Sequence, residues 1–214
     1  SVASRGLGDV YKRQTSTAPE TRRAPQPRSV GMDVAYIAVF AALIWVSALI
    51  PPIPVGGVGV PITVQTLTIA VTGMVLGAWR GFAATGLYIV LGLIGLPVFA
   101  GGSGGLGALA GPSAGYLVSF PFFAGLIGLL AQISVKKLTG VKLWLALVGA
   151  ALVARYLIVW PVGAFGIHLN GGVPLEAAFL ADVPFWPGDL VKNILAGAIA
   201  LMVHRAFPTV LVRR

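Results

Sequence analysis

Residues 92–117 read GLIGLPVFAGGSGGLGALAGPSAGYL, and they lie inside a longer run, residues 81–135, that contains no charged side chain. A membrane-spanning helix needs about 20 consecutive apolar residues. The uncharged run has 55 residues, so it predicts two spans with a connection between them. The Gly-rich piece 101–115, which contains Pro112, is the expected connection.

Two interpretations of the Gly-rich connection are open. Non-helical backbone beside a membrane is tolerated where it is buried in protein or lines a cavity, because its N–H and C=O groups need partners. Glycine also lets a ligand approach the backbone closely. The connection is therefore either part of a binding site or a flexible loop between two helices.

The composition is that of an integral membrane protein. Of the 214 residues, 57% are hydrophobic and 10% are charged, and the mean hydropathy is +0.92. Soluble domains carry about 25% charged residues, so we expect one helical bundle in a membrane. The chain has no cysteine, which excludes disulfides and thiolate metal sites. We expect no cofactor and no metal.

The apolar runs predict an all-α fold, a bundle of six transmembrane helices. The fifth span carries Arg155 and an expected kink at Pro161. The expected spans are residues 34–50, 62–79, 82–99, 113–135, 143–167 and 188–207.

The net charge of +9 reflects membrane topology rather than nucleic-acid binding, because the basic residues gather at the chain ends and in alternate connections. The connections 51–61, 100–112 and 168–187 contain no Lys or Arg. Under the positive-inside rule this alternation places both termini in the cytoplasm. The Gly/Pro-rich loops and Asp182 then lie on the outer face. Apart from Arg155 and Lys192, the basic residues are Arg22, Arg23, Arg28, Arg80, Lys136, Lys137, Lys142, Arg205, Arg213 and Arg214, with Arg5, Lys12 and Arg13 near the start.

The chain divides into four parts. Within residues 1–14, SVASRGLGDVYKRQ, the piece DVYKRQ at 9–14 resembles a translated sequencing-library adapter, and we interpret all 14 residues as an artefact outside the fold. Residues 15–32 predict a disordered basic cytoplasmic tail, residues 33–207 the six-helix membrane domain, and residues 208–214 a second cytoplasmic tail. No P-loop pattern occurs, so uphill transport needs another subunit or an ion gradient.

Asp189 and Lys192, in PFWPGDLVKN, are the most informative charged residues. Three residues apart on a helix, they share one face about 4.5 Å apart along the axis. Charges inside a membrane protein commonly mark a functional site. Alternatively, Asp189 caps the last span. A lysine in the first helical turn opposes the helix dipole, which favours ligand binding by the pair.

Other polar groups surround this pair in the outer half of the expected bundle. Gln65 and Thr63 offer uncharged donors and acceptors for a urea- or amide-like group. Arg155 either pairs with a buried carboxylate or stabilises the bundle. The outer aromatic and amide residues are Phe99, Tyr116, Asn170, Phe185 and Trp186.

Ser103, in GGSGG, with His168 is an alternative candidate, an intramembrane serine hydrolase. Such a dyad requires the histidine within hydrogen-bond reach of the serine and oriented by a third group. The sequence around His168, GIHLN, gives no sign of that group.

Small residues recur at spacings that allow close helix packing in lipid. Ala38 and Ala42 form one pair, and Gly73, Gly77 and Gly81 form a second series. Both sets either pack the bundle internally or dock another membrane subunit.

Five sequence blocks, in order and together spanning most of the chain, resemble the BioY family. They are VPITVQTL at 60–67, MVLGAWRG at 74–81, LYIVLGLIGLPVFAGG at 87–102, GPSAGYL at 111–117 and PFWPGDLVK at 184–192.

The resemblance implies the biotin-binding S component of an energy-coupling-factor (ECF) transporter, with six helices, an outward-facing biotin pocket and no enzymatic activity. The alternative is an S component of the same fold for another small vitamin. The implied partners are a transmembrane coupling subunit, contacted through Ala38 and Ala42, and two cytoplasmic ATPases. The implied biotin site contains Asp189 and Lys192, joined less specifically by Gln65, Tyr88, Gly102, Ser103 and Tyr116. The implied location is the bacterial cytoplasmic membrane.

Overall fold

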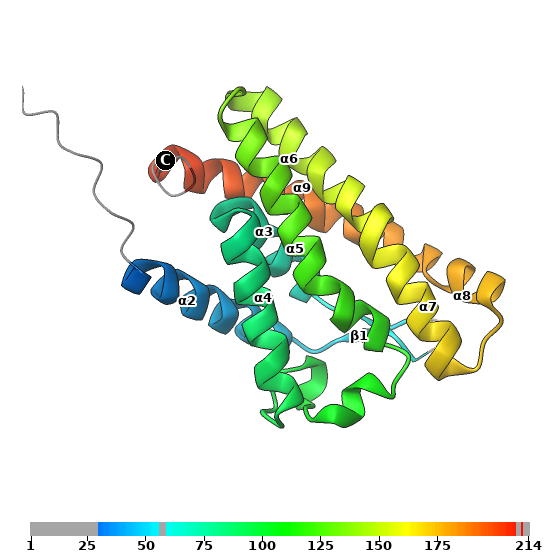
Figure 1. Ribbon diagram of the computed structural model, residues 1–214. Helices are drawn as coiled ribbons and strands as arrows, with labels where there is room; N and C mark the ends of the chain where they lie inside the picture. The colour runs from blue at the N-terminus through cyan, green and yellow to red at the C-terminus, as the bar shows by residue number, and fades with distance from the viewer. Residues whose placement is uncertain (1–29, 56–58, 209–210, 212–214) are drawn as a thin grey trace, which may run out of the picture. The chain divides into compact units, whose positions relative to one another are not determined.

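The computed structural model describes residues 30–55, 59–208 and 211. In these ranges the main helices are α2 (Val30–Ala48), α3 (Gln65–Leu76), α4 (Ala78–Leu93), α5 (Ala114–Val135), α6 (Gly140–Ala154), α7 (Trp160–Gly171), α8 (Leu175–Ala181) and α9 (Trp186–Ala206) (Figure 1). Shorter elements are β1 (Ile53–Pro54), β2 (Pro61–Ile62), the 3-10 turns η1 (Ala100–Gly102), η2 (Leu106–Leu109) and η4 (Val183–Phe185), and the π-turn η3 (Arg155–Val159).

The predicted parts at the two chain ends lie largely outside the described residues. This holds for residues 1–14, for 15–29 of the first tail and for most of 208–214. Helix α2 begins at Val30, three residues before the expected start of the bundle. At the other end, Leu211 packs against the hydrophobic core.

The prediction of an all-helical bundle with six membrane helices is confirmed, with α6, η3 and α7 forming one continuous segment. Four helical stretches in the described part of the chain are long and apolar enough to cross a membrane. They are Val30–Ala48, Ala114–Val135, Gly140–Gly171 and Leu175–Ala206. Helices α3 and α4 are apolar but shorter.

The boundary between α3 and α4 differs from the prediction, because the break falls at Gly77. The φ angle of Gly77 is 83°, a conformation that glycine adopts readily and other residues rarely do. Arg80 therefore lies inside α4 rather than in a connection. We expected the third span to cover residues 82–99. The helix ends earlier, at Leu93, because the chain turns before Gly95 and Pro97.

The fifth helical segment is irregular just before Pro161, where a kink was predicted. Residues Arg155–Val159 form a π-turn, and Pro161 follows in the first turn of α7. Proline lacks the N–H that would bond one turn back, and a π-turn is one way for a helix to accommodate such a loss. The irregular turn holds Arg155, which is buried.

The region 168–187 is mostly helical, although we expected a loop. Helix α7 continues to Gly171, and α8 and η4 follow after Gly172, whose φ angle is 64°. Helix α9 then begins at Trp186, two residues before the predicted start of the last span. This earlier start changes the positions of Asp189 and Lys192 within the helix.

Helix α5 is central to the bundle, packing against α3, α4, α6 and α7 (Figure 1). Glycines allow the closest approaches. A Cβ atom on Gly73 would lie 2.4 Å from the carbonyl oxygen of Ala124, and one on Gly128 would lie 2.3 Å from the backbone of Gly77. The glycine series 73, 77 and 81 therefore packs the bundle internally.

Replacing Gly128 with alanine should destabilise the bundle by about 1–3 kcal/mol, the usual cost of forcing an extra carbon into a packed core. The matched control is Gly149→Ala in α6, where an added Cβ meets nothing within 4 Å. That change should be neutral or slightly stabilising, because alanine favours helix. Thermal unfolding in detergent measures both, and equal midpoints for the two variants would contradict this packing.

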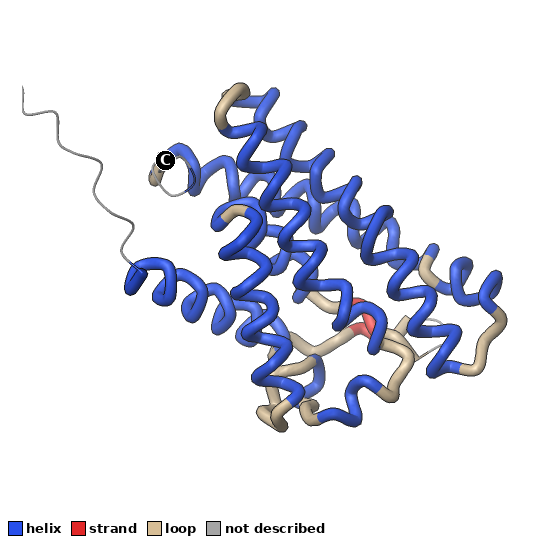
Figure 2. The backbone as a smooth tube through the Cα atoms, viewed as in Figure 1, coloured by secondary structure: helices blue, strands red, loops and turns tan. Residues whose placement is uncertain are grey.

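The strands and the longer irregular segments gather at one end of the bundle (Figure 2). Strands β1 and β2 pair antiparallel, with Ile53 opposite Ile62. The Gly-rich connection folds back on α4, since the N–H of Gly105 donates to the carbonyl oxygen of Gly92 at 2.7 Å. The connection is therefore an anchored wall at this end of the bundle.

Candidate substrate-binding site

A cavity of about 350 Å³ lies at the end of the bundle that carries the strands. Pockets for small molecules commonly occupy about 300–1,000 Å³. The wall combines β2 and the start of α3, the Gly-rich connection, the start of α5, the π-turn and the start of α9. The lining residues are Gly59, Val60, Pro61, Ile62, Thr63, Gln65, Thr66, Phe99, Ala100, Ser103, Ala108, Gly111, Pro112, Ser113, Tyr116, Leu117, Phe120, Arg155, Val159, Phe185, Asp189 and Lys192.

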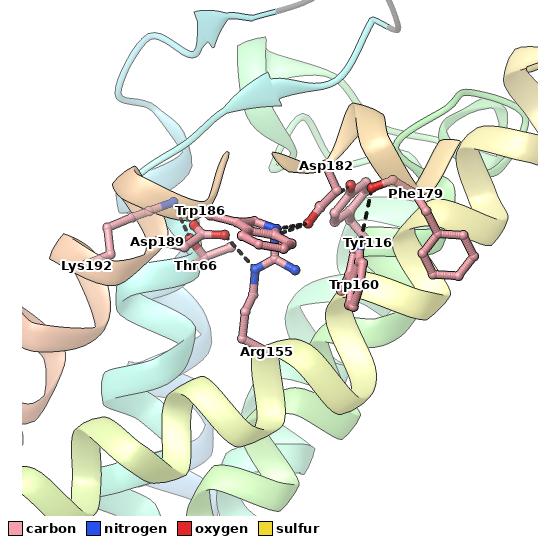
Figure 3. Close-up of polar contacts among 9 residues, drawn as sticks. All are labelled: Thr66, Tyr116, Arg155, Trp160, Phe179, Asp182, Trp186, Asp189 and Lys192. Carbon is pink, nitrogen blue, oxygen red and sulfur yellow. Dashed lines mark hydrogen bonds and ion pairs between the residues drawn. The ribbon is translucent and has the colours of Figure 1, made fainter. Parts of the chain in front are cut away.

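Arg155 lies between two carboxylates on the cavity wall (Figure 3). Its Nε donates to Asp189 Oδ2 and its Nη2 donates to Asp182 Oδ2, both at 2.6 Å. Arg155 is 3% exposed and Asp182 is fully buried. Removing one partner from a buried ion pair leaves an uncompensated charge. Arg155 therefore compensates the charges of both carboxylates. Of the two roles considered for Arg155, the structure supports pairing with a buried carboxylate.

Lys192 continues the chain of alternating charges from Asp189 toward α3 (Figure 3). Its Nζ lies 2.6 Å from Asp189 Oδ1 and donates to Thr66 Oγ1 at 2.7 Å and to the carbonyl oxygen of Thr63 at 3.1 Å. The four charges of Asp182, Arg155, Asp189 and Lys192 sum to zero. This balance allows a polar wall to exist inside an apolar bundle.

Asp182 belongs to this network, although the sequence reasoning placed it only on the outer face. Tyr116 donates to its Oδ1 at 2.6 Å, and Trp186 Nε1 donates to its Oδ2 at 3.0 Å. A signal was present in the sequence, because a buried arginine needs compensating acids and few are available near the spans. Thr66 was also missed, since a threonine at the start of a helix carries no signal of its own.

An aromatic cluster covers the network on the side of α7 and α8. Trp160 meets Tyr156, Phe179 and Trp186 edge-on at centroid distances of 5.4–6.1 Å. The guanidinium of Arg155 lies 6.0 Å from the centroid of the Tyr156 ring. Such an apolar cover keeps water away from the ion pairs and strengthens them.

The structure brings together five of the seven predicted substrate-binding residues. Gln65, Ser103, Tyr116, Asp189 and Lys192 line the cavity.

Tyr88 and Gly102 do not line it. Tyr88 is buried behind Gln65, which donates from its Nε2 to the Tyr88 hydroxyl oxygen. Gly102 lies beside Ser103 in the connection. Of the outer aromatic and amide residues, Phe99, Tyr116 and Phe185 line the cavity. Asn170 instead donates to the carbonyl oxygens of Leu109 and Gly111 and so secures the connection.

The alternative that Asp189 caps the last span is wrong. The N-cap residue of α9 is Phe185, and Asp189 uses its carboxylate for Arg155 and Lys192 instead. The dipole argument for Lys192 also fails, because the earlier start at Trp186 places Lys192 in the second helical turn. The argument that Asp189 and Lys192 belong to a functional site therefore rests on their ion pairs.

Ser103 and His168 do not form a dyad in the described part of the chain. Ser103 Oγ donates to the carbonyl oxygen of Ala100 at 3.1 Å. His168 Nδ1 lies 2.7 Å from the carbonyl oxygen of Val173, so this nitrogen carries the proton and donates it. Among the described residues, no group of three or more His, Asp or Glu side chains is arranged to hold a metal.

Comparison with known proteins gives a consistent result. The sequence pattern of the BioY family matches residues 20–209. A protein of Rhodobacter capsulatus named biotin transporter BioY is 40% identical over 191 residues, which cover 85% of this chain and 98% of that protein. A protein of Rhizobium etli with the same name is 35% identical, covering 82% of this chain and 95% of its own length.

A solved structure shares the fold. It is described as the S-component for biotin from an ECF-type ABC transporter, and it superposes with a TM-score of 0.75 at 31% identity. The superposition covers 82% of this chain and 92% of the other. The five sequence blocks, the six helices and these matches agree, and the chain belongs to the BioY family.

Proposed function

We propose that this chain captures biotin as the S component of an ECF-type transporter and carries it across the cytoplasmic membrane. A transmembrane coupling subunit and two cytoplasmic ATPases complete the transporter. Identity to named biotin transporters over most of both chains carries this proposal. BioY proteins are transporters and not enzymes, which, with the separate hydrogen bonds of Ser103 and His168, removes the hydrolase alternative.

The chemistry of the cavity suits biotin. Biotin has a cyclic urea with two N–H donors and one carbonyl acceptor, an apolar thioether ring and a chain that ends in a carboxylate. Acceptors are available on Asp189 and Gln65, and Lys192 is a cationic donor. Apolar surfaces of Phe99, Phe120 and Val159 lie on the same wall. We propose substrate contacts for Asp189, Lys192, Gln65, Ser103 and Tyr116.

We propose that the cavity opens to the outside and that both termini are cytoplasmic. Basic residues lie at the helix ends remote from the cavity: Arg80 starts α4, Lys136 follows α5, Lys142 starts α6 and Arg205 ends α9. Positive charge concentrates on the cytoplasmic side of membrane proteins. With this orientation the protein collects its substrate before the coupling proteins act.

The proposed role predicts a division between binding and uptake. Cells that contain this chain without coupling proteins should accumulate little labelled biotin, and adding the coupling subunit and ATPases should raise uptake strongly. Uptake by a biotin-auxotrophic host with and without the coupling genes measures this. Equal uptake in both hosts would contradict the dependence on a coupling module.

Changing Ala42 to leucine should reduce coupled uptake severely while leaving biotin affinity near normal. Ala38 and Ala42 are both exposed on α2, away from its buried face at Ala41 and Ile44. A bulky side chain there would block close approach of a partner helix. The control is Ala177→Leu on α8, an exposed alanine on another element. Loss of biotin affinity in Ala42→Leu would show that this face packs the bundle instead.

A further inference from the structure

Tyr88 is buried behind the cavity wall, where it contacts a residue that lines the cavity. It is 1% exposed and does not line the cavity. Its hydroxyl group donates to the carbonyl oxygen of Val98 at 3.0 Å, and its ring packs edge-on against Phe99. Its hydroxyl oxygen receives a hydrogen bond from Gln65 Nε2. Tyr88 therefore contacts the cavity wall through two lining residues, Gln65 by a hydrogen bond and Phe99 by ring packing.

Counting protons fixes the orientation of the Gln65 amide. A phenol has one proton, and a backbone carbonyl can only accept. The Tyr88 proton is committed to Val98, so the Tyr88 oxygen can only accept from Gln65. With the amide turned over, two oxygens without a proton between them would face each other. Amide orientation in a protein follows from its hydrogen-bond network, and here the network allows one answer.

The fixed amide gives the cavity an acceptor. Gln65 lines the cavity, and its Nε2 is held by Tyr88. Its Oε1 has no hydrogen bond within the described part of the chain, and it remains open to the cavity rather than fully enclosed. An open acceptor on a pocket wall selects a ligand group that donates a hydrogen.

We propose that Tyr88 is a positioning residue for substrate selectivity. By holding the Gln65 amide, it makes Gln65 Oε1 the acceptor for one urea N–H of the substrate, and Asp189 is the acceptor for the other. The inference rests on the proposed function, because it needs a ligand with urea N–H groups. It explains why a residue outside the cavity belongs to the same sequence block as the cavity wall.

The test compares biotin with two cyclic carbamate analogues, in which one or the other urea N–H is replaced by oxygen. This replacement keeps size and shape but turns a donor into an acceptor. Against the unchanged protein, the analogue whose oxygen meets Gln65 Oε1 should bind roughly ten- to hundredfold more weakly than biotin, the usual effect of leaving a buried acceptor unpaired.

Tyr88→Phe removes the constraint on the amide. Biotin should then bind about three- to tenfold more weakly, the worth of one hydrogen bond. The analogue whose oxygen meets Gln65 Oε1 binds more weakly than biotin, and in Tyr88→Phe this ratio of affinities should shrink at least threefold. The reason is that the freed amide can turn and donate from Nε2. The control Tyr36→Phe, the same change on α2 beside Arg80 and outside the cavity lining, should alter neither ratio.

Biotin and the analogue whose oxygen meets Gln65 Oε1 are each titrated against the parent protein and the Tyr88→Phe variant. The four affinities distinguish the outcomes. Weaker biotin binding with an unchanged analogue penalty would reduce Tyr88 to a packing role and overturn the inference. If Tyr88→Phe does not fold, Gln65→Met supplies the test, since it should weaken biotin and abolish the penalty of the same analogue. A persisting penalty in Gln65→Met would also overturn it. Failure of the parent protein to bind biotin would instead reject the proposed function.

Discussion

The Arg155→Met variant should lose about 3–5 kcal/mol of folding free energy, the usual cost of removing one partner from a buried ion pair. Methionine approximates the length of the stem but leaves Asp182 and Asp189 without the guanidinium that contacts both. Asp182 suffers more, because its side chain has no solvent exposure, whereas Asp189 keeps Lys192. Thermal unfolding of the purified protein in detergent should show a large fall in the midpoint.

The chain offers a matched control in Arg80→Met. Arg80 contacts Asp33 at 2.6 Å, and their side chains are 16% and 30% exposed, so solvent reaches this pair whereas the Asp182 side chain has no exposure. Surface pairs contribute about 0–1 kcal/mol, so Arg80→Met should cost much less than Arg155→Met. The double variant Arg155→Met with Asp182→Asn should recover part of the lost stability, since the buried uncompensated charge is removed. Similar midpoints for Arg80→Met and Arg155→Met, or no recovery in the double variant, would contradict the buried network.

The second large effect concerns binding. Asp189→Asn should weaken biotin by roughly tenfold to 150-fold, because a hydrogen bond to a charged group contributes about 1.5–3 kcal/mol. The change keeps the size of the side chain and removes its charge. Since Phe185 rather than Asp189 occupies the N-cap of α9, the loss cannot be assigned to helix capping. Calorimetric titration of each variant with biotin measures the effect.

Two comparisons complete that experiment. Glu176→Gln, the same kind of change on the exposed face of α8, should leave affinity unchanged. Lys192→Met should weaken biotin strongly, and a biotin derivative with an amidated carboxylate shows which group Lys192 meets. If Lys192 meets the carboxylate, its loss should matter less for the amide than for biotin. Parent-like affinity in both Asp189→Asn and Lys192→Met would place the substrate elsewhere.

Much of the fold was predictable because lipid imposes a strong rule on sequence. Long apolar runs predicted the fourth span to within one residue of α5. The break at Gly77 was not predicted, because a single glycine with a positive φ looks like any other glycine in the series. The helical character of 168–187 was missed because short helices such as α8 have no long apolar period.

The sequence analysis predicted several residues of the candidate site, but it did not predict the hydrogen bonds and ion pairs that join them. The charged pair Asp189 and Lys192 is visible in sequence because charges are rare in spans. The link from Arg155 to Asp182 crosses 27 positions and depends on how α8 returns toward the π-turn. Tyr88 was expected in the cavity, but its position behind Gln65 follows from helix packing, which no local pattern encodes.

Titration of the detergent-purified chain with biotin, riboflavin and thiamine tests the central claim most directly. The account predicts saturable biotin binding at one site per chain, with riboflavin and thiamine binding far more weakly or not at all. Tighter binding of riboflavin or thiamine than of biotin would contradict it.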